Sequence, residues 1–130
     1  MYQSTQGNMG LGRAIQYFTS WNIPVALPLN DTQKYDLIAD IDGKLQKIQV
    51  KTSRYMGSSL SSYEVQLKKS SGNKITNFDN TTCDYVFIYT ADEKMYLIPA
   101  QEIKAKTSVR VGNMYKEYCV QCKNLSDIGD

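Results

Sequence analysis

The sequence predicts an α/β fold in which a mixed β-sheet carries an N-terminal helix on one face. Three observations predict this fold class. Apolar residues recur at helical spacing near the N-terminus, two alternating runs flank an Asp-Gly dipeptide, and residues 83–90 are almost continuously apolar. Helical spacing indicates an amphipathic helix, alternation indicates a half-buried hairpin, and a short apolar run indicates a buried central strand.

The first helix is predicted from Ser4 to Trp21, where apolar side chains recur at i, i+3, i+4 and i+7. Gly7, Gly10 and Gly12 lie inside this segment, although each glycine weakens a helix by ~1 kcal/mol relative to alanine. Three glycines so close together predict a close approach of the helix, either to the sheet or to a ligand.

Residues 35–53 are predicted to form a hairpin around Asp42-Gly43, because this dipeptide favours a two-residue turn with positive φ at both positions. Ile41 then lies opposite Lys44, and opposed residues share a face of the sheet. The core face is expected to carry Tyr35, Leu37, Ala39, Ile41, Ile48 and Val50. The other face is expected to carry Lys34, Asp36, Ile38, Asp40, Leu45, Lys47, Gln49 and Lys51.

The polar face brings together three side chains that suit phosphodiester chemistry. Asp36 is expected opposite Gln49 as a non-hydrogen-bonded pair, with Cβ atoms roughly 4.5–5.5 Å apart. A carboxylate and an amide oxygen suit a hard divalent cation, and Lys51 can stabilise a phosphoryl oxygen or the attacking water. The sequence has no histidine, so hydrolysis here is expected to depend on a metal ion. An amphipathic hairpin with solvated charges is the alternative interpretation.

The remaining elements follow in order along the chain. Further strands are predicted at residues 25–29, 63–68, 83–90, 95–98 and 115–120, with a short helix at 99–104 that opens on a proline. Residues 70–82 and 106–113 are predicted to be connections, and the small polar residues of 55–62 predict a surface loop.

Composition is that of an ordinary soluble domain: 130 residues, 42% hydrophobic and 22% charged, with a net charge of +2. The charge is unevenly distributed, because residues 44–74 hold seven basic residues against one acid. Such a segment suits a phosphate backbone, with solvated surface as the alternative. The candidate DNA contacts are Arg13, Lys47, Arg54, Lys68, Lys69 and Lys74.

A cytoplasmic location and no membrane partner are expected. No signal peptide heads the sequence, and no apolar run approaches the ~20 residues that span a bilayer. The three cysteines, an odd number, argue against a disulfide framework.

The hairpin sequence resembles a known family. A Tyr-Asp-Leu-Ile strand at residues 35–38, a glycine turn, and a strand ending Gln-Val-Lys-Thr at residues 49–52 resemble the PD-(D/E)XK nucleases. More narrowly, they resemble the Gln-x-Lys variant found in small group I intron-associated and phage-type endonucleases. The resemblance covers most of the chain, and implies one restriction-endonuclease-like nuclease domain over residues 1–130.

The resemblance implies a metal-dependent endodeoxyribonuclease of homing or mobile-element type. Asp36 and the Gln49 amide oxygen would hold Mg²⁺ or Mn²⁺, and Lys51 would stabilise the scissile phosphate. Related nucleases commonly place a glutamate on the first helix, but the helix predicted here contains no Asp or Glu. Gln6 or Asn8 could supply an amide oxygen in its place.

Double-stranded DNA is the expected partner. Because one chain carries one site and a duplex has two strands, a homodimer or a higher even homo-oligomer is expected. Two alternatives remain open at this point. One is a resolvase of Holliday junctions or other branched DNA, and the other is a non-catalytic DNA-binding module with a decayed site, since the helix acid is missing and Gln49 is neutral.

Overall fold

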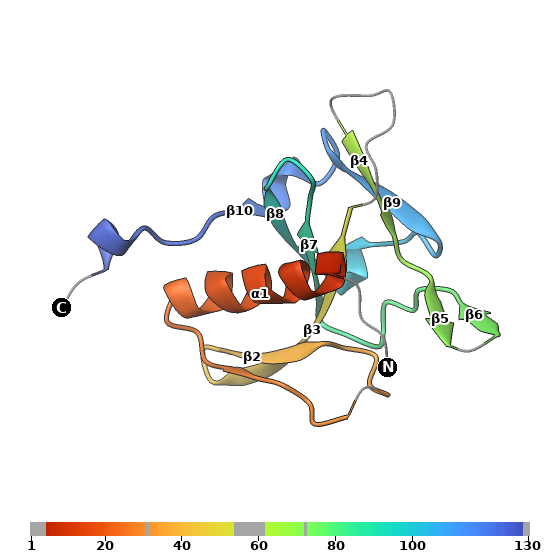
Figure 1. Ribbon diagram of the computed structural model, residues 1–130, viewed down its shortest axis with the longest axis horizontal. Helices are drawn as coiled ribbons and strands as arrows, with labels where there is room; N and C mark the ends of the chain where they lie inside the picture. The colour runs from red at the N-terminus through yellow and green to blue at the C-terminus, as the bar shows by residue number, and fades with distance from the viewer. Residues whose placement is uncertain (1–4, 31, 54–61, 72, 129–130) are drawn as a thin grey trace.

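A six-stranded mixed sheet with one helix on its face forms the centre of the computed structural model, which describes residues 5–30, 32–53, 62–71 and 73–128 (Figure 1). The strand order is β1-β2-β3-β7-β8-β10, with β3 and β7 parallel and all other neighbours antiparallel. The elements are α1 (Thr5–Ser20), β1 (Val25–Ala26), β2 (Leu37–Ile41), β3 (Lys44–Thr52), β7 (Tyr85–Tyr89), β8 (Met95–Pro99) and β10 (Cys119–Val120). The predicted fold class is confirmed.

Two small antiparallel sheets and three short 3-10 helices complete the described fold. The first sheet pairs β4 (Ser62–Gln66) with β9 (Ser108–Gly112), and the second pairs β5 (Lys69–Ser71) with β6 (Lys74–Thr76). The 3-10 helices are η1 (Ala100–Glu102), η2 (Lys116–Tyr118) and η3 (Leu125–Asp127). Among the residues described, no helix is long and apolar enough to cross a membrane.

The β2–β3 hairpin has the predicted turn and register. Asp42 and Gly43 both have positive φ, 55° and 83°, and Ile41 pairs with Lys44. Leu37 and Ile48, expected on the core face, are fully buried. The turn residues therefore set the register that places the polar side chains on the other face.

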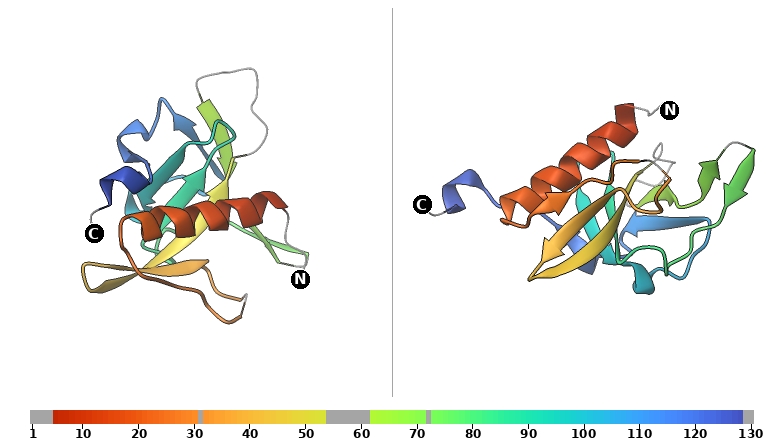
Figure 2. Two further views of the ribbon diagram at one scale, coloured as in Figure 1. Left: turned by 60° about the vertical axis from the view of Figure 1, so that its left-hand side comes forward. Right: turned by 90° about the horizontal axis from the view of Figure 1, so that it is seen from below.

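Helix α1 lies across one face of the sheet, directly over β3 and β7 (Figure 2). Its contact with β3 explains one of its glycines. A Cβ atom on Gly10 would lie 3.3 Å from Cγ1 of Val50 and only 2.6 Å from Cγ2 of Thr52, and the second distance is shorter than packed atoms approach. The cluster between helix and sheet contains Ala14, Phe18, Leu37, Ala39, Ile48, Phe87 and Met95.

The opposite face of the sheet is covered by a second apolar cluster, which includes residues of both β4 and β9. Its fully buried members are Val65, Val86, Ile88, Ile98, Ala100 and Val111. Because successive residues of β3 face opposite sides of the sheet, Ile48 packs under α1 while Gln49 faces the β4–β9 side. The functional candidates of β3 thus lie on the face away from the helix.

Two predicted connections contain strands instead. Residues 106–113 hold β9, and residues 70–82 hold part of the β5–β6 hairpin. Strand β9 was missed although its one basic residue, Arg110, alternates with the buried Val109 and Val111. The predicted strands at 25–29 and 115–120 are shorter than expected, and the predicted helix at 99–104 is only the 3-10 turn η1. The predicted surface loop at 55–62 lies almost wholly outside the described residues.

Candidate active site

The candidate site lies at the open end of the β2–β3 hairpin, where Asp36 precedes β2. The backbone N–H of Asp36 donates to the carbonyl of Ile48 (2.8 Å), and its Oδ2 accepts from the backbone N–H of Val50 (2.7 Å). The regular ladder ends at Leu37–Ile48, one pair before the expected Asp36–Gln49 pair, because the carboxylate takes the place of a backbone acceptor. This bond fixes the Asp36 carboxylate against β3, next to Gln49.

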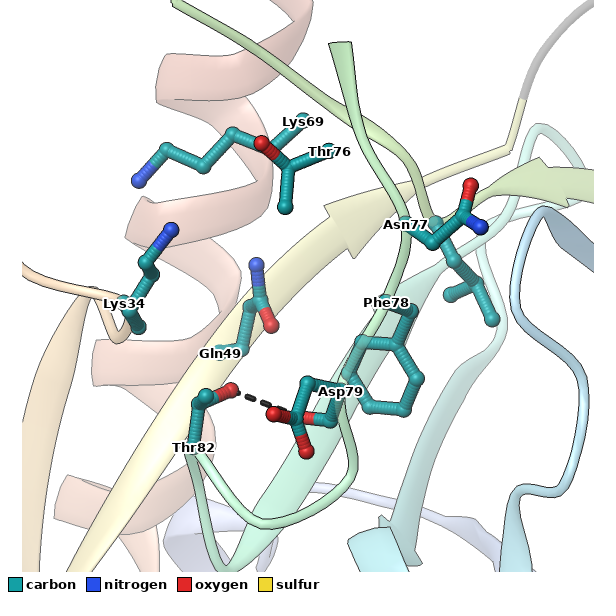
Figure 3. A pocket seen from close by; sticks show the side chains of 9 residues that line it. Lys34, Gln49, Lys69, Thr76, Asn77, Phe78, Asp79 and Thr82 are labelled. Carbon is teal, nitrogen blue, oxygen red and sulfur yellow. Dashed lines mark hydrogen bonds between the residues drawn. The ribbon is translucent and has the colours of Figure 1, made fainter.

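Gln49 is the polar residue of β3 that the fold buries most, with 8% of its surface exposed. Its Oε1 lies 4.0 Å from the Cys83 Sγ, and its amide projects into a pocket bordered by Lys34 and Lys69 (Figure 3). Burial raises the pKa of the Cys83 thiol to about 11. Cys83 is therefore a neutral, weak donor to Gln49 at neutral pH and neither a nucleophile nor a thiolate ligand.

Lys51 is partly buried at the end of β3. Burial lowers the pKa of Lys51, the Asp36 carboxylate opposes that change, and the Lys69 ammonium reinforces it. Lys51 borders a cleft of about 260 Å³ between the start of α1 and β4. The cleft is lined by Gln6, Gly7, Val50, Lys51, Thr52, Gln66 and Lys68.

Of the two amides that could replace the missing helix acid, Gln6 is the one that borders this cleft. Its Nε2 donates to the backbone carbonyl of Ser53, which ties the start of α1 to the end of β3. Because the nitrogen makes this bond, the Gln6 amide oxygen is the atom left to act in the cleft. Asn8 is an exposed residue of α1 and is not among the described residues that line the cleft.

The donor atoms fit a hard divalent cation that binds few protein ligands. Asp36 supplies a carboxylate and Gln49 an amide oxygen, and both are ligand types that Mg²⁺ accepts. In the part of the chain that is described, no group of three or more His, Cys, Asp or Glu side chains could hold a metal ion. A cation at Asp36 would therefore need further oxygens from water and from a phosphate.

Three of the predicted DNA contacts lie on β5, on β6 or just before them. Lys68 lines the Lys51 cleft, and Lys69 lines the pocket beside Gln49, where its Nζ donates to the carbonyl of Gln33 (2.9 Å). Lys74 is exposed on the β5–β6 hairpin. Lys68 and Lys69 thus border the two cavities beside the candidate site.

The other predicted contacts are placed differently. The Lys47 Nζ lies 5.6 Å from the centre of the Tyr35 ring. The Arg13 guanidinium, on α1, lies 4.9 Å from the Tyr89 ring centre and 4.0 Å from the Glu93 carboxylate, so it has local partners on the helix side. Arg54 lies outside the described residues.

The pocket beside Gln49 was not predicted as a unit. Lys34 was placed on the polar face of the hairpin but not among the DNA contacts, and residues 76–82 were expected to be a simple connection. The structure folds that connection back over Gln49, with Phe78 buried beneath it (Figure 3). The only sequence signal was the position of Lys34, two residues before Asp36 on the same face.

Comparisons with known proteins concern the family and the fold of the chain. The sequence profile of the PD-(D/E)XK endonuclease family matches residues 1–126. Among solved structures, that of a bacterial homing endonuclease, I-Ssp6803I, superposes with a TM-score of 0.71 over 91% of this chain and 88% of that chain. The sequences are 24% identical, so this likeness concerns the fold. No curated protein matches the chain.

Proposed function

The chain belongs to the PD-(D/E)XK endonuclease family, and on that premise we propose that it hydrolyses phosphodiester bonds of double-stranded DNA with Mg²⁺ or Mn²⁺ as cofactor. The fold shared with a homing endonuclease supports a homing-type or mobile-element-associated role. Residues 1–130 would act as one nuclease domain.

One observation carries the proposal. The bond from the Val50 amide to the Asp36 carboxylate places an acid beside Gln49 and within electrostatic range of Lys51. The three residues lie at the same end of one hairpin, and groups carried by regular elements are held more accurately than groups carried by loops. An ordinary surface hairpin would leave its charges in solvent, whereas Gln49 and Lys51 are withdrawn from it.

Each side chain has a separate task in the proposed reaction. Asp36 and the Gln49 oxygen would hold the cation, which when bound would polarise the phosphate and favour ionisation of water. Lys51 would donate to a phosphoryl oxygen and stabilise the charge that develops there. The Gln6 oxygen would orient water from the helix side of the cleft.

One observation favours a second candidate, a DNA-binding module without activity. Asp36 is the one acid proposed as a metal ligand, and the described residues contain no group of three or more His, Cys, Asp or Glu side chains that could hold a metal ion. A single charged ligand binds a divalent cation weakly unless the substrate contributes a phosphate oxygen. The two candidates therefore differ in whether DNA and metal together produce cleavage.

A nicking assay on supercoiled plasmid separates them. The enzyme is expected to nick in Mg²⁺ or Mn²⁺ and to be inactive in EDTA, while DNA binding persists in EDTA. Binding without nicking at any divalent cation concentration would leave the binding module as the function.

We also propose a homodimer or a higher even homo-oligomer, because concerted cleavage of both strands needs two sites. Sedimentation at micromolar concentration should show such an assembly. A monomer that still makes concerted double-strand cuts would contradict it.

A further inference from the structure

The pocket beside Gln49 is a small cavity of about 110 Å³ that opens next to the proposed active site. Gln49 forms its wall toward β3, and residues 76–82 form the wall opposite. Two lysines border it from separate parts of the chain, Lys34 before β2 and Lys69 at the start of β5. Figure 3 shows both ammonium groups on one side of Gln49.

The fold holds these two cations near each other. The Lys69 Nζ donates to the carbonyl of Gln33, the residue that precedes Lys34 (2.9 Å). This bond fixes the Lys69 ammonium beside the backbone from which Lys34 extends. Within the described part of the chain, neither lysine forms an ion pair.

The acid in this pocket, Asp79, offsets only part of the charge of the two lysines. Its Oδ1 accepts from the backbone N–H (2.9 Å) and the hydroxyl (2.6 Å) of Thr81. These two bonds, with smaller effects of Lys106 and Lys34, lower the pKa of Asp79, so it is ionised at neutral pH and its charge partly offsets that of Lys34. In Figure 3 its carboxylate lies on the far side of Gln49 from both ammonium groups.

Two lysines and one acid leave a net positive charge around this small pocket, and an anion between the two ammonium groups removes their mutual repulsion. The cavity has room for one phosphate group, and lysine is a common phosphate ligand. Gln49 lines this pocket and is also a proposed ligand of the metal ion, so the pocket and the proposed metal site are adjacent. A strand whose scissile phosphate reaches Asp36 and Lys51 would thus present a neighbouring phosphate to this pocket.

We propose that Lys34 and Lys69 together bind a single phosphate of the cleaved DNA strand, adjacent to the scissile phosphate. This inference rests on the proposed function, because it takes the substrate strand to pass over Gln49. The two lysines are substrate-binding residues and do not contact the reacting atoms.

Sharing of one phosphate has a measurable consequence. Binding of DNA releases counterions, so the logarithm of the binding constant falls linearly with the logarithm of salt concentration. The slope of this line is about −0.9 for each phosphate that the protein neutralises. Removing both lysines should therefore reduce the slope by about 0.9 if they share one phosphate, and by about 1.8 if they contact two.

The binding experiment uses a short DNA duplex of fixed sequence, in EDTA, over a range of salt concentrations. The variants are Lys34→Ala, Lys69→Ala and the double variant. Lys116→Ala, an exposed lysine of η2, is the matched control. The double variant should bind roughly tenfold more weakly, with a slope reduced by about 0.9, while Lys116→Ala should match the wild type. Lys34→Arg, which keeps the charge, should retain the wild-type slope.

A nicking assay on supercoiled plasmid in Mn²⁺ tests the same variants for turnover. The double variant should raise KM roughly tenfold and change kcat little, because its lysines hold substrate away from the scissile bond. A fall in kcat alone would contradict the inference.

The outcomes separate the inference from the proposed function. If the wild type nicks DNA and the double variant behaves like Lys116→Ala, the phosphate pocket is refuted and the nuclease stands. If the slope falls by about 1.8, the lysines contact separate phosphates and the shared site is wrong. If the slope falls by about 0.9 but the wild type never nicks, the pocket stands and the nuclease proposal fails.

Discussion

The contact between Gly10 and β3 gives the most quantitative prediction about the scaffold of the site. This contact sets the distance between α1, which carries Gln6, and the end of β3, which carries Lys51. In Gly10→Ala the new methyl group would lie 2.6 Å from the Thr52 Cγ2, so helix or strand must shift. Gly12, in the same helix, has no atom within 4 Å of the equivalent position, which makes Gly12→Ala a matched control.

The magnitude follows from comparing the two variants. Glycine to alanine inside a helix stabilises by ~1 kcal/mol, and this gain is common to both positions. Overpacking a filled interface costs ~1–3 kcal/mol, and this cost arises only at Gly10. The free energy of unfolding of Gly10→Ala should therefore be ~1–3 kcal/mol below that of Gly12→Ala. Adding Thr52→Ser, which deletes Cγ2, should recover much of the loss.

Urea unfolding at constant m-value measures these differences, and plasmid nicking by the same proteins reports on the cleft. Gly10→Ala should lower cleavage as well as stability, whereas Gly12→Ala should leave cleavage unchanged. Equal unfolding free energies for Gly10→Ala and Gly12→Ala would show that α1 does not contact β3 as described.

The remaining predictions concern β3 itself. Lys51→Met should reduce cleavage by about 10²-fold or more with little loss of DNA affinity. Burial lowers the pKa of Lys51, so the charged lysine destabilises the folded protein at neutral pH. This destabilisation is relieved as the pH rises toward the pKa that Lys51 has in the unfolded chain. Lys51→Met should therefore raise the free energy of unfolding at pH 7. Unchanged nicking would contradict its role. Gln49→Glu places a second carboxylate beside Asp36, so calorimetric titration in the absence of DNA should show tighter Mn²⁺ binding. An unchanged affinity for Mn²⁺ would mean that the cation binds elsewhere.

The hairpin and its polar face could be predicted because their determinants are local. Asp42-Gly43 fixes the turn, and alternation then decides which residues face the core as far as Leu37 and Ile48. The prediction for Tyr35 was wrong, because beyond this pair the ladder ends and Tyr35 packs against the opposite cluster. The same two rules predicted that Asp36, Gln49 and Lys51 share the polar face. These rules could not predict the hydrogen bond that the Val50 amide donates to the Asp36 carboxylate, because there a side-chain oxygen takes the place of a backbone acceptor of the ladder.

The unpredicted parts depend on contacts between distant segments. Strand β9 exists because β4 pairs with it, and its own sequence carries a weak signal. The pocket beside Gln49 forms because residues 76–82 fold back over Gln49 and because the Lys69 ammonium donates to the carbonyl of Gln33. The role of Gly10 was left open between sheet and ligand, and the structure assigns it to packing against Thr52.

The central claim is that the acid at the end of this hairpin is required for metal-dependent cleavage, and Asp36→Asn tests it most directly. An asparagine oxygen can still accept the Val50 amide, so the hairpin should keep its structure. Asp42→Asn, the same change at the exposed turn, is the control. In a nicking assay with Mn²⁺, Asp36→Asn should lose cleavage and keep or increase DNA affinity, while Asp42→Asn cleaves normally. Cleavage that survives in Asp36→Asn would move the metal site away from this hairpin.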